Sequence, residues 1–293
     1  MNLRPTHLEH IIGQQKTIEA IQTNLKAVQK TGEVFPHMLL SGPAGTGKSL
    51  ICEALANELN RPIEIANAAN LSGFKGILPY LMRVRPHSIL FVDEVHRLGP
   101  RLIDSLLTII EQFRVDLGED GNVSFPLPEF TFVAATTNKG KLPNTFIDRF
   151  VLKYTLKLYS DEELTEIVRG NIKKLEIKLS DGAIKLVVDS SRQTPRIANN
   201  RLLWIRNYSI AHSIPIVESQ HVEKCLHIED IDKNGFTYND RKYLEELKKH
   251  QPAGINTMVA VTNIERDTIE SVVEPFLLTS GIIKKTRKGR ILA

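Results

Sequence analysis

One run of eight residues, 42–49, has the composition and spacing of a phosphate-binding loop. It reads Gly-Pro-Ala-Gly-Thr-Gly-Lys-Ser and matches the pattern G-x-x-x-x-G-K-[ST]. Glycines such as Gly45 and Gly47 let backbone N–H groups turn inward around phosphate oxygens, where a side chain would clash. Lys48 is expected to reach the β- and γ-phosphates, and the Ser49 hydroxyl to bind Mg²⁺. A chance glycine-rich turn is the alternative, but a predicted strand before the loop and a predicted helix after it favour an ATP or GTP site.

A pair of acids, Asp93 and Glu94, follows four apolar residues at positions 89–92. Because ligands of α/β sheets bind at the carboxyl ends of the strands, this pair is expected near the phosphates. Asp93 would position Mg²⁺, and Glu94 would act as the base that orients and deprotonates the attacking water. The alternative is a strand that ends in two solvated acids, and the preceding phosphate loop argues against it.

The elements that must position these groups alternate between strands and helices. Apolar spacing predicts helices over residues 14–30, 48–59 and 102–113, and buried strands over residues 37–41, 88–92 and 130–135. Near-continuous apolar strands between helices indicate a parallel sheet that is covered on both faces. The predicted fold class of the first part is therefore α/β.

The pattern changes after residue 159. Residues 161–230 show only helical patterns, and Ser160 followed by three acids is typical of a helix N-terminus. A linker is expected at 231–235, then helices over about 238–249, 256–262 and 267–278. Two short apolar runs, 281–283 and 290–292, complete what reads as a winged helix. We therefore predict three domains, 1–159, 160–231 and 232–293.

Composition narrows the class of protein. The 293 residues are 42% hydrophobic and 25% charged, which excludes a largely disordered chain and a fibre. The net charge is +4, from 38 basic and 34 acidic residues, and there are only two cysteines. Both cysteines are expected to be buried thiols in a reducing compartment. No apolar run reaches the ~18 residues that a membrane span needs, so we expect a cytoplasmic protein that does not enter a membrane.

The order of the motifs resembles that of a known family. The motifs are residues 93–98 (Asp-Glu-Val-His-Arg-Leu), 134–138 (Ala-Ala-Thr-Thr-Asn), 148–150 (Asp-Arg-Phe) and 194–199 (Thr-Pro-Arg-Ile-Ala-Asn), followed by 235–238, 240–242, 265–270, 274–276 and 288–290. In this order they resemble the AAA+ ATPases and, within them, the RuvB family of Holliday-junction branch-migration motors. The resemblance covers essentially the whole chain. It implies a P-loop sheet domain, a small helical lid and a C-terminal winged-helix domain.

The resemblance also implies roles for single residues. Thr137 matches a sensor of the γ-phosphate, with Asn138 as a substitute, and Arg196 matches a second sensor on the lid. Arg149 matches an arginine finger that completes the ATP site of a neighbouring subunit; a surface salt bridge is its alternative. N-terminal residues such as Leu3 and Ile12 match the segment that wraps the adenine, and Tyr159 matches a residue at the lid hinge near the nucleotide. Apolar packing explains these positions about as well. The residues expected to bind the nucleotide are Leu3, Arg4, Ile12, Gly45, Gly47, Lys48, Ser49, Leu50, Thr137, Tyr159 and Arg196.

A basic cluster near the C-terminus is the candidate DNA contact. Residues 284–290 hold five basic side chains in seven. At a hairpin tip they would bind phosphates rather than read bases. The resemblance singles out Arg266, Lys285, Lys288 and Arg290, whereas a solubilising tail is the alternative.

The family further implies a ring, a hexamer, on duplex DNA or a Holliday junction. Residues 115–125 read as a short hairpin with an Asp-Gly turn, which in the family docks the junction-binding partner RuvA. The family's Arg-Asp-Arg-Phe-Gly is here Ile-Asp-Arg-Phe-Val at 147–151, and an extra Asn follows residue 199.

Two other functions stay open: an AAA+ loader or replication initiator, and a DNA-binding regulator with a merely structural nucleotide site. Retention of Glu94 and Arg149 favours hydrolysis over the regulator.

Overall fold

The computed structural model describes residues 3–117 and 123–293, which form two compact units. The first unit ends at Leu158 and the second begins at Tyr159. The predicted boundaries after residues 159 and 231 stay predictions.

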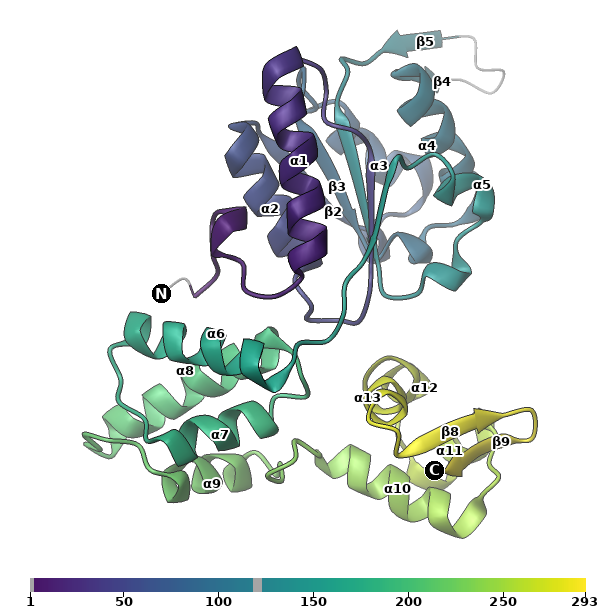
Figure 1. The fold of residues 1–293 in the computed structure, drawn as a ribbon. Helices are drawn as coiled ribbons and strands as arrows, with labels where there is room; N and C mark the ends of the chain where they lie inside the picture. Colours follow the sequence, from purple (N-terminus) through teal and green to yellow (C-terminus); the bar gives the residue numbers. More distant parts are fainter. Residues whose placement is uncertain (1–2, 118–122) are drawn as a thin grey trace. The chain divides into compact units, whose positions relative to one another are not determined.

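The first unit is built on a parallel sheet, which confirms the predicted α/β class (Figure 1). Its five strands pair in the order β2-β3-β6-β1-β7. They are β1 Met38–Ser41, β2 Ile63–Asn67, β3 Ile89–Asp93, β6 Thr131–Thr136 and β7 Leu152–Thr155. The predicted strands β1, β3 and β6 are the interior ones. β2 and β7, which sequence reasoning missed, are the two edges.

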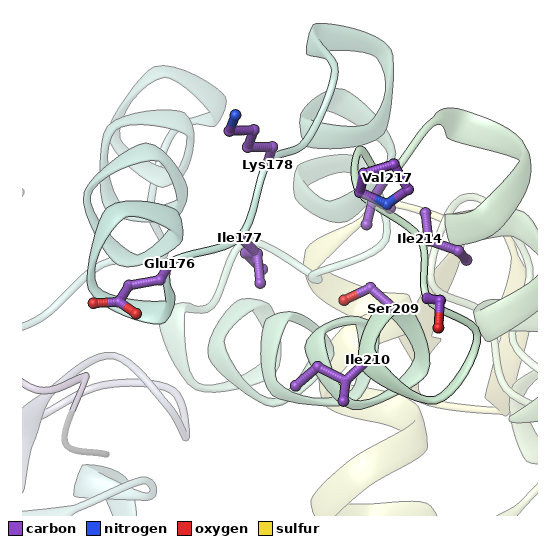
Figure 2. Close-up of a pocket in the computed structure, with 9 residues that line it drawn as sticks. Glu176, Ile177, Lys178, Ser209, Ile210, Ile214 and Val217 are labelled. Carbon is purple, nitrogen blue, oxygen red and sulfur yellow. The ribbon is translucent and has the colours of Figure 1, made fainter.

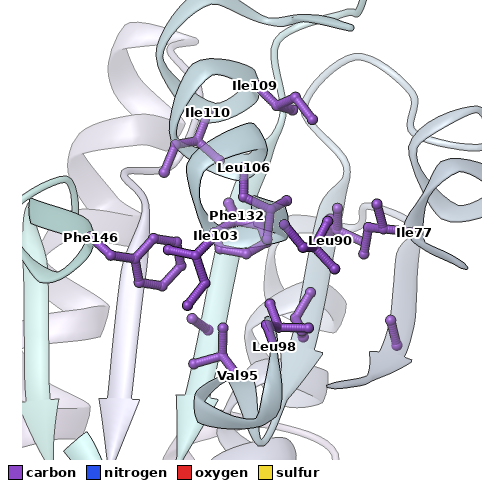
Figure 3. Packing of buried hydrophobic residues seen from close by; sticks show 14 of the residues in the cluster. Ile77, Leu90, Val95, Leu98, Ile103, Leu106, Ile109, Ile110, Phe132 and Phe146 are labelled. Carbon is purple, nitrogen blue, oxygen red and sulfur yellow. The ribbon is translucent and has the colours of Figure 1, made fainter. Parts of the chain in front are cut away.

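Helices cover both faces of this sheet (Figure 1). They are α1 Gln15–Thr31, α2 Lys48–Leu59, α3 Gly73–Leu81, α4 Pro100–Gln112 and α5 Asn144–Ile147, with 3₁₀ turns η1 Leu8–His10, η2 Ala68–Asn70, η3 Val95–Arg97 and η4 Lys139–Lys141. Successive strand residues face opposite sides, so Phe91 and Val133 pack with α1 and α2. Leu90 and Phe132 instead pack with Leu106 and Phe146 from α4 and α5 (Figure 3). The strands therefore lie between two packed apolar cores.

A separate two-stranded hairpin follows α4. β4 Arg114–Leu117 pairs antiparallel with β5 Val123–Pro126, and Val115 is buried in the core on the α4 side of the sheet. This agrees with the hairpin expected over 115–125. Its predicted Asp-Gly turn lies outside the described residues.

The second unit contains the helical segment and the C-terminal module. The helices are α6 Asp161–Leu175, α7 Asp181–Asp189, α8 Pro195–Ala211, α9 Ser219–Ile228, α10 Tyr238–His250, α11 Ile255–Thr262, α12 Arg266–Thr268 and α13 Glu274–Thr279, with a π-helical segment η5 Ile269–Val273. Ser160 caps α6 through a capping box with Glu163, as the acid-rich start predicted. The hairpin β8 Ile283–Thr286 and β9 Gly289–Leu292 completes the winged helix.

Arg192 joins the helical segment to the winged helix within the second unit. Its Nε donates to the carbonyl oxygen of Gly235 at 2.8 Å, and its guanidinium pairs with the fully buried Asp240. The same guanidinium lies 4.2 Å from the centre of the Phe276 ring. Since a buried pair is costly to break, these contacts resist separation of the two parts.

Candidate active site

The phosphate loop connects β1 to the first turn of α2. Gly42, Gly45 and Gly47 have φ angles of 140°, 80° and 102°, a region that glycine enters at little cost. A Cβ on Gly42 would lie 2.5 Å from the carbonyl oxygen of Leu156. Backbone conformation and packing both require glycine here, as the motif predicted.

Lys48 and Ser49 open α2, directly after the loop. The buried Lys48 side chain folds back over the loop, where its ammonium donates to the carbonyl oxygens of Gly42 at 2.8 Å and Pro43 at 2.9 Å. Ser49 is half-buried in the same turn, and so is Leu50 after it. The positive end of the helix dipole adds to the attraction for an anion at this place.

Parallel pairing brings the acids and the predicted sensor to the edge that carries the loop. β1, β6 and β3 are neighbours and run in the same direction, so the residues after their carboxyl ends share one edge. Asp93 is the last residue of β3, and Thr137 follows β6. The structure therefore gathers the loop, Asp93, Glu94 and Thr137 as the motif order predicted.

Glu94 is held by defined hydrogen bonds. Its Oε2 accepts from the Thr137 backbone N–H at 3.1 Å and from the Thr137 hydroxyl at 2.9 Å. Its own N–H donates to Asp93 Oδ1 at 2.9 Å, and its φ of 52° turns the chain sharply after the strand. The His96 ring nitrogen Nδ1 lies 3.2 Å from the same Oε2. The carboxylate is thus fixed in direction.

Arg149 forms an ion pair with Glu111 of α4, and its side chain is 47% exposed. The surface salt bridge expected as the alternative role of Arg149 is present, with Glu111 as the acid. Asp148 instead lies 3.8 Å from the Lys153 ammonium. Val151, close by in the chain, is a large apolar residue with 75% exposure.

The other predicted nucleotide residues lie in both units. In the first unit Leu3 is buried, Ile12 is half-buried, and Arg4 lies 3.7 Å from Glu53. In the second unit Tyr159 is buried and its N–H donates to the carbonyl oxygen of Gln193 at 3.0 Å. Arg196 is exposed in the first turn of α8, after Pro195 at the helix start. Their roles stay predictions.

The basic residues of the winged helix divide into two groups. Lys288 is exposed at the hairpin turn, and Arg266 pairs with Glu270 on the surface. By contrast, Lys285 and Arg290 both pair with Glu274, whose side chain is fully buried. The Arg290 side chain is only 15% exposed, so its guanidinium is committed to the domain interior.

Glu274 is the centre of a buried polar cluster in this domain. It accepts from Tyr243 Oη at 2.9 Å and from Arg290 Nε at 2.7 Å, and Lys285 Nζ lies 2.6 Å away. Burial raises the pKa of Glu274, but the hydrogen bonds from Arg290, Lys285 and Tyr243 outweigh burial and lower it overall. Glu274 is therefore an anion that depends on its partners.

This cluster predicts different results for two substitutions in the basic hairpin. Arg290→Ala removes one of three partners of a buried carboxylate, so the free energy of unfolding should fall by roughly 1–3 kcal/mol. Lys288→Ala should change stability by less than about 0.5 kcal/mol, weaken DNA binding equally across sequences, and lower the salt slope by about 1. Urea unfolding and DNA titration at several salt concentrations measure both. An equally large stability loss in Lys288→Ala would contradict this assignment.

A pocket of ≈ 320 Å³ lies in the helical segment, where Figure 2 shows Glu176, Ile177 and Lys178 opposite Ser209 and Ile210. None of the predicted site residues lines it.

Across residues 3–117 and 123–293, no three His, Cys, Asp or Glu side chains cluster as a metal site. Within the same ranges, no helix has the length and apolar character to span a bilayer.

A parallel sheet with a phosphate loop after β1, two acids at the end of β3 and a following helical lid defines a nucleotide-binding P-loop ATPase of the AAA+ class. Comparison with known families is more specific. Residues 3–156 match the P-loop domain of the Holliday junction DNA helicase RuvB, residues 159–232 the RuvB AAA lid domain, and residues 233–293 the RuvB C-terminal winged-helix domain. The chain belongs to the RuvB family.

Individual relatives agree with this assignment. A Holliday junction branch migration complex subunit RuvB of Rhodopirellula baltica is 38% identical over 99% of this chain and 82% of its own length. The Thermotoga maritima RuvB Holliday junction branch migration motor has a TM-score of 0.90 and 31% identity, over 99% of this chain and 95% of that one. NtrX from Brucella abortus, solved with ADP, has a TM-score of 0.59 at 14% identity, covering 92% of this chain and 70% of that one, and shares the fold alone.

Three residues of the site surroundings were missed by sequence reasoning. His96 contacts the Glu94 carboxylate, Glu111 pairs with Arg149, and Glu274 binds two of the predicted DNA-contact residues. His96 lies in the 93–98 motif, in which only Asp93 and Glu94 had an expected role. Glu274 lies in the 274–276 motif, for which no role was expected. Glu111 carried no local signal, because it meets its partner only through the fold.

Proposed function

We propose that this chain is an ATP-driven motor that moves duplex DNA and drives branch migration of Holliday junctions. The observation that carries the proposal is the family match over all three domains, together with a loop, two acids and a sensor threonine at one sheet edge. A loader or initiator shares the ATPase and winged-helix domains, but RuvB family models match this chain throughout.

ATP would be held by the 42–49 loop, with Lys48 against the β- and γ-phosphates. The Ser49 hydroxyl and the Asp93 carboxylate are hard oxygen donors of the kind Mg²⁺ prefers, so the residues present fit that ion. Bound Mg²⁺ supplies charge neutralisation across the phosphate oxygens. Glu94 would accept the proton of the attacking water, and Thr137 would contact the γ-phosphate.

We propose that the chain assembles into a hexameric ring, in which the neighbouring subunit supplies the arginine that completes each ATP site. Arg149 is half-exposed, and the apolar Val151, two residues later in the chain, is exposed as well. Such residues are suited to contact with a second copy. In the ring, Arg149 would reach the ATP of the neighbouring subunit. The β4–β5 hairpin would dock a RuvA-type junction-binding protein, and the exposed Lys288 would contact DNA phosphates.

The proposal is tested by measuring ATP hydrolysis with no DNA, with linear duplex and with a four-way junction, each with and without a RuvA protein. We expect the highest rate with the junction and RuvA, together with conversion of the junction into two duplexes. ATP turnover that DNA does not change, without any strand exchange, would contradict a motor and favour a loader. Binding to one preferred sequence without hydrolysis would favour a regulator.

A further inference from the structure

We propose that His96 is a positioning residue for ATP hydrolysis, whose Nδ1–H hydrogen bond orients the Glu94 carboxylate. The inference rests on the proposed function, because it concerns the residue expected to activate water. It adds a group that the motif assignments leave without a role.

The contact is buried and well defined. The His96 side chain is only 10% exposed, and Nδ1 lies 3.2 Å from Glu94 Oε2 and 3.0 Å from the Thr136 hydroxyl. η3 places His96 two residues beyond Glu94, over the carboxyl end of β6. Little space is left for solvent to replace the ring as a donor.

The chemistry of the two groups fixes where the proton lies. A carboxylate has no hydrogen to donate, so the contact is attractive only when Nδ1 carries a hydrogen. The Thr136 hydroxyl oxygen already accepts from the Asn138 N–H at 3.0 Å and has a second lone pair to share the Nδ1 hydrogen. The tautomer with hydrogen on Nδ1 therefore satisfies both contacts.

A neutral ring suits this role better than a charged one. Burial lowers the pKa of His96, while the nearby Glu94 carboxylate acts in the opposite direction and is outweighed. The shift keeps the ring uncharged at neutral pH. A neutral donor orients the carboxylate without adding a full positive charge that would reduce its basicity.

The hydrogen bonds single out one carboxylate oxygen. Thr137 donates twice to Oε2, and His96 approaches the same atom. Anchoring Oε2 leaves Oε1 as the oxygen that accepts a proton from water, and the orientation of that oxygen then depends on His96.

The test compares two substitutions at this position. His96→Asn places an amide N–H close to the position of Nδ1, whereas His96→Leu fills the space without a donor. A hydrogen bond to a charged group is worth about 1.5–3 kcal/mol, so we expect kcat for ATP to fall roughly 10- to 100-fold in His96→Leu. The KM for ATP should stay within about twofold, and His96→Asn should recover most of kcat.

A double substitution separates positioning from general structural support. In the Glu94→Gln background, His96→Leu should cause no further loss of single-turnover rate, because the group that it orients is already absent. The inference is overturned if His96→Leu hydrolyses ATP at the parental rate. It is also overturned if Leu and Asn lose kcat equally while ATP binding weakens, since that marks a structural role. A parent protein without ATP hydrolysis would instead overturn the proposed function.

Discussion

Replacing Glu94 by Gln should leave ATP binding intact and slow ATP hydrolysis at least about 100-fold, the lower range for loss of a general base. The amide keeps the size of the carboxylate, and its carbonyl oxygen can still accept both hydrogen bonds from Thr137. An uncharged amide cannot take the proton of water. We therefore expect the variant to remain folded, bind ATP and accumulate stabilised rings on DNA.

Single-turnover hydrolysis and nucleotide titration measure these two effects separately. Glu129→Gln is a matched control, because it makes the same change at an exposed position on the loop before β6. That control should hydrolyse ATP at the parental rate. If Glu94→Gln itself turns over ATP like the parent, another group activates the water and the assignment of Glu94 is wrong.

How well a strand can be predicted from the sequence depends on how deeply its residues are buried in the sheet. β1, β3 and β6 lie inside the sheet and consist of continuous apolar or small residues, apart from Asp93 at the end of β3, so composition alone reveals them. β7 reads Leu-Lys-Tyr-Thr and alternates between half-buried and exposed positions. An edge strand needs apolar residues on fewer positions, and its pattern is too short to separate from a loop.

The site was predictable where chemistry imposes local spacing. Phosphate binding requires glycines and a lysine within eight residues, so the loop is visible in the sequence without the fold. The partner of Arg149 is different, since Glu111 lies on α4 and meets the arginine only when the core on that face forms. No local rule distinguishes Glu111 from other exposed acids.

The contacts of the basic C-terminal hairpin likewise could not be predicted from local sequence. Its five basic residues look equivalent in sequence, yet Lys285 and Arg290 are cross-strand partners in β8 and β9. Opposite residues of an antiparallel pair share one face of the hairpin. Here both side chains on that face pair with Glu274 of α13. The register of the strands, rather than the charge of the residues, pairs Lys285 and Arg290 with the buried Glu274, whereas Lys288 is exposed at the turn.

Arg149→Ala should bind ATP but hydrolyse it about 10³-fold more slowly or worse, because a guanidinium no longer neutralises charge on the transferred phosphoryl group. Loss of the ion pair to Glu111 should matter little, since half-exposed pairs contribute about 0–1 kcal/mol. Glu111→Gln is the matched control: it breaks the same pair and keeps the arginine. Hydrolysis should survive in the control, and an equal loss in both variants would make the salt bridge itself the cause.

Mixing experiments decide whether Arg149 acts on the neighbouring subunit. An Arg149→Ala subunit keeps its Glu94, and a Glu94→Gln subunit keeps its Arg149, so each variant alone should be inactive. In a ring assembled from both, about one interface in four joins an intact Glu94 to an intact Arg149, because every interface of a head-to-tail ring uses two different faces. Mixed rings should therefore regain a fraction of the parental ATP turnover. If rings verified to contain both variants stay inactive, Arg149 does not complete the site of its neighbour.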